Sequence, residues 1–91
     1  MTQTDIKREV IAVLMGMGVS SKAITDHASF QKDLGLDSLD FAEMVMEFEM
    51  RFNLDIPFTE AELITTVSEA ISYLYQNLQQ KTTISVSAER G

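Results

Sequence analysis

The sequence contains no cysteine, which excludes a disulfide framework and a metal site built from thiolates. Aromatic residues make up only 8% of the 91 residues, whereas hydrophobic residues make up 45%. A chain of this length buries roughly 60% of the surface that its unfolded form exposes, which is enough for one small core but not for two. Its stability must therefore come from side-chain packing within a single domain.

Long apolar runs are also missing. The run from Val10 to Val19 is far shorter than the roughly 18 apolar residues that a membrane-spanning helix needs. Asp5 and Glu9 alternate with Lys7 and Arg8 before this run, and no small-residue cleavage pattern follows it, so it does not resemble a secretory signal. We therefore expect a cytoplasmic protein without a membrane span.

Basic residues are scarce, because seven Lys and Arg face fourteen Asp and Glu, for a formal net charge of −7. Such a charge repels nucleic acid and anionic lipid and favours basic protein surfaces as partners. More than half of the acids lie between Asp37 and Glu62, where Arg51 is the only base. An ordinary solvated surface mixes both signs, so we interpret this crowding as a surface for recognising a basic partner.

The spacing of apolar residues predicts helices and no strand of useful length. A first amphipathic helix is predicted over residues 4–16. Residues 17–37 show no sustained period and indicate a long ordered loop, which in a compact domain is more often functional than idle. A second helix is predicted over residues 38–52, with Asp37 as its N-cap and Asp40 in its first turn.

Two capping-box signatures predict the remaining helices. Thr59–Glu62 has the spacing that opens a helix, here a short one that ends before Thr65. Thr66–Glu69 repeats this signature, and the apolar residues that follow it on one face as far as Leu78 predict a last long helix.

The end of the chain differs in composition from the rest. Residues 81–91 are rich in Ser and Thr and show no helical period, so we expect them to form a disordered tail. No internal repeat or composition shift divides residues 1–80. They are predicted to form one all-α domain.

The predicted second helix has two apolar stripes, and so small a domain cannot bury both. At about 100° per residue, one stripe, which we assign to the core, consists of Phe41, Met44, Val45, Phe48 and Phe52. The other, which we call the second stripe, consists of Leu39, Ala42, Met46 and Met50, with Glu43 and Glu49 on its flanks. It could be scattered surface methionine. However, it starts beside Ser38, has a carboxylate rim and contains adaptable methionine, so we interpret it as a docking site.

Ser38 lacks the neighbours that a nucleophilic serine enzyme needs. The glycines of a Gly-x-Ser-x-Gly elbow are absent beside it, and the only histidine, His27, lies in the long loop. A calcium loop that starts at Asp33 would need glycine and glutamate at the positions of Ser38 and Met44. We therefore predict no catalytic residue and no dedicated metal site.

The residues around Ser38 resemble the attachment site of an acyl carrier protein. The resemblance spans about Ile6 to Leu78 and includes Ala28–Phe30, Asp33–Gly35, Asp37–Asp40, Glu43, Val45–Met46, Glu49, Phe52, Ile56–Pro57, Ala61–Glu62 and Ile64–Val67. It implies a four-helix bundle with a long first loop and a short third helix. It also implies that residues 1–80 are an acyl-carrier domain in which Ser38 bears a 4′-phosphopantetheine arm from coenzyme A, whose thiol holds the cargo.

The same resemblance implies a role and a set of partners. The chain would be a monomeric carrier rather than an enzyme, serving fatty-acid, polyketide or specialised lipid synthesis. Its partners would be a phosphopantetheinyl transferase and acyl-transferring and condensing enzymes with basic docking surfaces. Together with the second stripe, it predicts a partner-binding surface that comprises Asp37, Leu39, Asp40, Ala42, Glu43, Met46, Glu49 and Met50.

Two positions depart from the family pattern. Phe41 stands where these carriers often have a smaller residue, and Met50 where an acidic residue is common in the housekeeping fatty-acid members. Both favour a specialised carrier and leave the pathway open. The competing hypothesis is an unmodified acidic helical adaptor that binds basic partner proteins through the second stripe, with Ser38 as a plain helix cap.

Overall fold

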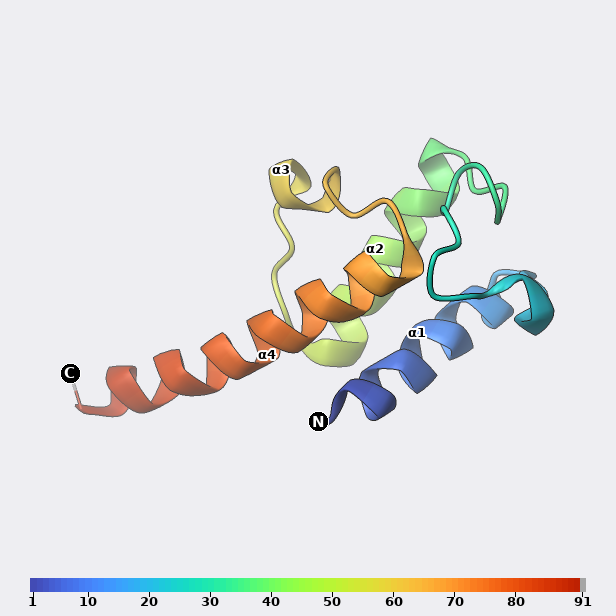
Figure 1. The fold of residues 1–91 in the computed structure, drawn as a ribbon. Helices are drawn as coiled ribbons and strands as arrows, with labels where there is room; N and C mark the ends of the chain where they lie inside the picture. The colour runs from blue at the N-terminus through green and yellow to red at the C-terminus, as the bar shows by residue number, and fades with distance from the viewer. Residues whose placement is uncertain (91) are drawn as a thin grey trace.

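The computed structural model describes the backbone of residues 1–90 and the side chains of residues 1–79. The described residues form no named strand. They form the helices α1 (Gln3–Gly16), α2 (Ser38–Phe52), α3 (Phe58–Ala61) and α4 (Val67–Arg90) and the 3-10 helix η1 (Ser21–Ala23). Helix α1 packs against both α2 and α4, and a long loop leads from the end of α1 to the start of α2 (Figure 1). The predicted all-α class is confirmed.

One hydrophobic cluster joins the four α-helices and the first loop. Helix α1 contributes Ile6, Val10, Val13 and Leu14. The core stripe predicted for the second helix is buried, except that Phe41 is half-buried. The loop adds Ile24, Phe30 and Leu36 to the cluster, and no polar side chain is buried among the described residues. The fold therefore pays no desolvation cost for isolated polar groups in its core.

Helix α2 begins and ends where the sequence predicts. The Asp40 N–H donates to Asp37 Oδ1 at 2.8 Å, and the Asp37 N–H donates to Asp40 Oδ2 at 3.3 Å. This reciprocal pair is a capping box, in which each carboxylate satisfies a backbone donor that the helix start would leave unpaired. Asn53, in the left-handed conformation with φ 52°, ends the helix.

The first loop is ordered, as predicted, because backbone hydrogen bonds tie it to the start of α4. The Phe30 N–H donates to Thr65 O at 3.0 Å, and the Val67 N–H donates to Ala28 O at 3.1 Å. Residues 17–37 therefore pack over the bundle and bring the start of α2 to a defined place.

The capping box predicted at Thr59–Glu62 is wrong. Helix α3 begins at Phe58, so Thr59 lies inside it, and Pro57 precedes it without a side-chain cap. Pro57 takes the N-cap position in an extended conformation, with ψ 147°, and its carbonyl accepts the Ala61 N–H at 2.9 Å as the first hydrogen bond of the helix. Because proline has no N–H, no side chain can complete a capping box there, and Glu60 instead accepts a hydrogen bond from the Tyr73 hydroxyl of α4.

The second predicted capping box is confirmed at the start of α4. The Thr66 N–H donates to Glu69 Oε1 at 3.1 Å, and the Glu69 N–H donates to Thr66 Oγ1 at 3.3 Å. The Thr65 hydroxyl and N–H also donate to Glu69 Oε1, at 2.6 and 2.9 Å. One carboxylate thus joins the α3–α4 connection to the last helix.

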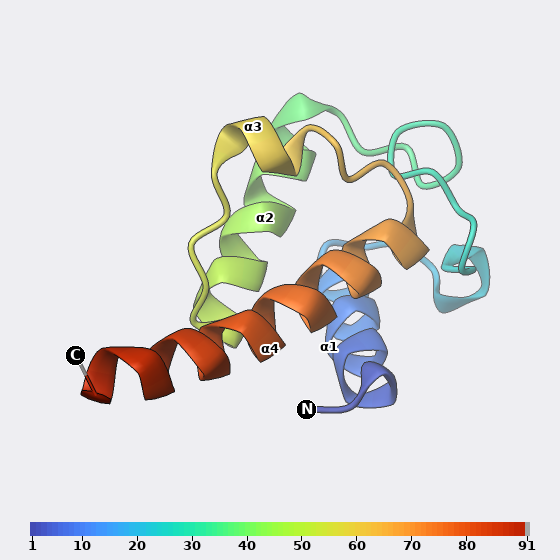
Figure 2. The ribbon, with the colours of Figure 1, turned by 60° about the vertical axis from the view of Figure 1, so that its left-hand side comes forward.

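The backbone of α4 continues to Arg90, past the end that the sequence predicts near Gln80, and extends beyond the other helices (Figures 1 and 2). Residues 81–90 contain neither glycine nor proline to stop a helix. The side chains of the predicted disordered tail, residues 81–91, lie outside the described residues, so this tail and the domain boundary at residue 80 stay predictions. No helix in the described part of the chain has the length and hydrophobicity to cross a membrane.

Replacing Asp37 by alanine tests the cap of α2. We expect Asp37→Ala to lower the free energy of unfolding by about 1 kcal/mol, because an N-cap oxygen is lost, as measured by urea denaturation. Asp55→Ala is the control, since Asp55 is equally charged and exposed but caps no helix. Equal destabilisation by the two substitutions would contradict the capping role.

The hydrogen bond from the Thr65 hydroxyl, with those from the Thr65 and Thr66 N–H groups, holds the pKa of Glu69 below its usual 4.5. A lowered pKa stabilises the fold above the unfolded-state pKa, and this stabilisation is lost as the pH falls through the folded-state pKa. We therefore expect the stability difference between the native chain and Glu69→Gln to be largest at neutral pH and to shrink below pH 4.5.

Urea denaturation at a series of pH values measures this difference. The matched control is Glu62→Gln, at an exposed carboxylate for which the described residues show no hydrogen bond. A difference for Glu69→Gln that does not change with pH would rule out the proposed linkage.

Candidate functional site

Ser38 is the first residue of α2, and its side chain is exposed. The Asp37–Asp40 capping box holds the backbone on both sides of it. Within the described part of the chain, no group makes a hydrogen bond to the Ser38 hydroxyl. The site therefore offers an accessible hydroxyl on a firm backbone, without a base to activate it.

The start of α2 suits a negatively charged group on this hydroxyl. The first N–H groups of a helix have no intrahelical partner, and the helix dipole places partial positive charge there. The capping box uses the N–H groups of Asp37 and Asp40. The N–H groups of Ser38 and Leu39 have no acceptor among the described residues, so they can bind a negatively charged group.

A cavity of about 550 Å³ opens beside Ser38. Helix α2 provides one wall, with Phe41, Val45 and Met46, and α3 with its flanking segments provides the other, with Phe58 and Ile64 among its residues. In both views α3 lies at the same height as the first turns of α2 (Figures 1 and 2). The cavity is lined mostly by apolar side chains and can shelter an apolar group attached near Ser38.

Two carboxylates hold the α3 wall in place. Glu49 Oε2 accepts a hydrogen bond from the Ile56 N–H at 2.9 Å, just before α3, and Glu60 accepts the Tyr73 hydroxyl. Burial, reinforced by the bond to Glu60, raises the pKa of Tyr73, so its hydroxyl remains a donor. The first contact spans seven residues of the sequence and the second spans 13.

The hydrogen bond between Glu49 and the Ile56 N–H changes the interpretation of Glu49. The sequence places it on the flank of the second stripe, but the residue is half-buried and its carboxylate binds the backbone at Ile56. A role of Glu49 in partner binding stays a prediction, and its role in positioning α3 was missed. The partner is seven residues away, outside the spacing of any capping motif.

The structure brings the second stripe together on the surface, as predicted. Leu39, Met46 and Met50 are 74%, 59% and 72% exposed, and Ala42 and Glu43 are also exposed. Sequence reasoning missed two further exposed apolar residues, Phe58 and Leu63, in and after α3. They belong to no periodic stripe, so only the proline before Phe58 pointed to a surface turn.

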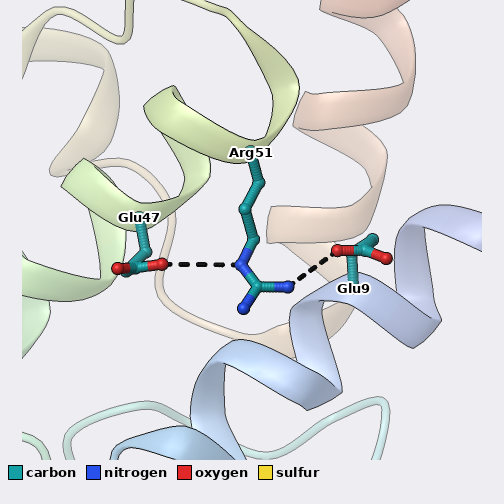
Figure 3. Close-up of polar contacts among 3 residues, drawn as sticks. All are labelled: Glu9, Glu47 and Arg51. Atoms are coloured by element: carbon teal, nitrogen blue, oxygen red, sulfur yellow. Dashed lines mark hydrogen bonds and ion pairs between the residues drawn. The ribbon is translucent and has the colours of Figure 1, made fainter.

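Arg51, the only base between Asp37 and Glu62, is bound by two glutamates (Figure 3). Its Nη1 lies 2.8 Å from Glu9 Oε1 on α1, and its Nε lies 3.4 Å from Glu47 Oε2 on α2. The hydrogen bond to Glu9 is the main cause that raises the pKa of Arg51. The guanidinium thus bridges α1 and α2, and its charge does not offset the acids near Ser38.

Comparison with known proteins agrees with this geometry. The chain matches the PP-binding family, described as the phosphopantetheine attachment site, over residues 8–74. It is 40% identical over 77 residues to acyl carrier proteins from two strains of Porphyromonas gingivalis, covering 84% of this chain and 99% of theirs. It is 42% identical over 77 residues to an acyl carrier protein of Chloroherpeton thalassium, covering 84% and 96% of the two chains.

These matches cover most of this chain and nearly all of each relative. The family carries its cargo on phosphopantetheine and passes it to acyl-handling enzymes, so this chain is a carrier and not an enzyme. The chain therefore belongs to the acyl carrier protein family.

Proposed function

We infer that Ser38 is the residue that bears the phosphopantetheine arm, and that the chain presents acyl thioesters to enzymes of fatty-acid, polyketide or specialised lipid synthesis. The observation that carries this proposal is the exposed, unbonded hydroxyl of Ser38 at the start of α2, beside an apolar cavity. In this role the chain acts in the cytoplasm. It acts as a monomer, since its charge of −7 opposes association with a second copy.

The residues at this site fit the arm. When a transferase modifies the chain, a bond forms between Ser38 Oγ and the phosphorus that carries the pantetheine of coenzyme A. The phosphoanhydride bond breaks, 3′,5′-ADP leaves, and a base of the transferase takes the hydroxyl proton. The phosphodiester then lies near the free N–H groups of Ser38 and Leu39, which favour its negative charge. The arm itself supplies the thiol that forms the thioester.

The second stripe and the acids around it support docking by basic partners such as the transferase and condensing enzymes. Glu43 is exposed and makes no ion pair among the described residues. Its charge therefore acts on the approaching partner rather than on the fold. Met46 and Met50 offer adaptable apolar contacts to several different enzymes.

The first test is transfer of the arm in vitro. Incubation with a phosphopantetheinyl transferase and coenzyme A should add the mass of one arm to the native chain and none to Ser38→Ala, because the acceptor hydroxyl is gone. Intact-mass spectrometry measures the gain. Ser72→Ala, which removes an exposed serine of α4, is the control and should gain one arm.

An equal gain on the native chain and on Ser38→Ala would refute the assignment of the site. If the native chain gained no arm and Ser38→Ala kept full biological activity, the unmodified acidic adaptor would be the better account.

The second test concerns the charge of Glu43. Glu43→Gln should slow arm transfer roughly two- to fivefold at low ionic strength, the range expected for one exposed ion pair, and the effect should shrink as salt is added. Initial rates at subsaturating carrier concentrations measure it. Gln76→Lys makes the same change in net charge on the exposed side of α4 and is the matched control. Equal slowing by both variants would point to net charge alone and contradict a docking surface at Glu43.

A further inference from the structure

Aromatic residues gather at the cavity beside Ser38. Three of the five phenylalanines of the chain line it: Phe30 from the first loop, Phe41 from α2 and Phe58 from α3. The ring centroids of Phe30 and Phe41 are 6.0 Å apart, with their planes tilted by 59°. The other two, Phe48 and Phe52, pair with each other in the core. The cavity therefore has more aromatic surface than a chain with 8% aromatic residues would lead one to expect.

Packing of the core explains only part of this arrangement. Phe30 is buried and Phe41 is half-buried against the core cluster, so the fold uses both rings. Phe58 is 79% exposed, and among the described residues it is neither part of the core cluster nor packed against it. It nevertheless lines the cavity from the α3 wall, opposite α2. Phe41 and Phe58 thus present aromatic surface to the cavity from its two walls.

Phenylalanine in these walls interacts differently with saturated acyl chains and with aromatic or conjugated ones. A saturated chain gains the same kind of apolar contact from leucine as from phenylalanine. A ring or a conjugated chain gains more from phenylalanine, because π systems attract one another in offset-stacked and edge-to-face arrangements beyond the effect of area burial. Met46 lies in the same lining, and its sulfur can make a favourable contact with the edge of an aromatic cargo. The volume of about 550 Å³ lies within the range of small-molecule pockets.

We propose that the cargo of this carrier is an acyl chain that bears an aromatic ring or conjugated double bonds, held between Phe41 and Phe58. This inference rests on the proposed attachment at Ser38 and names the chemical class of the group that the arm delivers to the cavity. Phe41 and the exposed Phe58, which line the cavity from α2 and α3, are then specificity-determining residues.

The test compares two cargoes with the same number of carbons. A transferase loads the native chain from cinnamoyl-coenzyme A or nonanoyl-coenzyme A, moving the acyl-phosphopantetheine group to Ser38 and releasing 3′,5′-ADP. The rate of thioester cleavage by hydroxylamine is then divided by the rate for the same thioester of free pantetheine. This ratio removes the difference in intrinsic reactivity. We expect the protein to protect cinnamoyl more than nonanoyl, by about two- to tenfold for each ring contact.

Phe58→Leu and Phe41→Leu should each reduce this preference, because each should lower the protection of cinnamoyl more than that of nonanoyl. Phe58 is exposed, so its replacement should not disturb folding. Met15→Leu is the control, because Met15 is exposed on α1 and does not line this cavity, and it should keep the preference. Equal protection of the two cargoes, or a preference that survives both phenylalanine substitutions, would overturn the proposal.

A second measurement does not depend on the arm. Free cinnamoyl-pantetheine, titrated into the unmodified chain, should shift the NMR signals of the Phe41 and Phe58 rings more than nonanoyl-pantetheine does. If the transferase assay adds no arm to the intact mass of the native chain, attachment at Ser38 is refuted. If the two probes shift the NMR signals of the two rings equally, the proposed cargo class is refuted. The two failures are therefore distinguishable.

Discussion

The reciprocal hydrogen bonds between Asp37 and Asp40 are the contact on which the site depends. They start α2 at Ser38. The position of the helix start sets the register of the helix and thus the direction in which each later side chain points. Met44 and Phe48 then point into the core, whereas the second stripe remains at the surface. The same two carboxylates leave negative charge on both sides of the hydroxyl. A local capping interaction thus supports the presentation of Ser38 and the acidic character of its surroundings.

Charge is distributed so that the fold and the surface do not compete. The core buries no polar side chain among the described residues, so apolar packing stabilises the bundle. Arg51 bridges α1 and α2 through Glu9 and Glu47, and its positive charge serves the packing of helices. The remaining acids near α2 repel one another slightly, and the proposed docking surface uses their charge to attract basic partners. A carrier that many enzymes must recognise is well served by this separation.

Local signals in the sequence predicted α2 and its two faces, because a capping residue and the helical period pointed to the same register. The start of α3 was missed because Pro57, which has no side-chain oxygen to mark it as a cap, takes the N-cap position two residues before Thr59. The cavity could not be predicted, since its α3 wall is held by the contact of Glu49 with Ile56 and that of Glu60 with Tyr73, which only the tertiary arrangement creates. For the same reason the exposure of Phe58 and its place in the cavity wall emerged only from the structure.

The central claim is that Ser38 bears a phosphopantetheine arm, whose thiol holds the cargo, and does not itself attack a substrate. Peptide mapping by mass spectrometry of the protein isolated from its native host tests this claim most directly. The account predicts a phosphopantetheine group, with or without acyl cargo, on the peptide that contains Ser38. An unmodified Ser38 throughout the isolated protein, or the arm on a different residue, would contradict it.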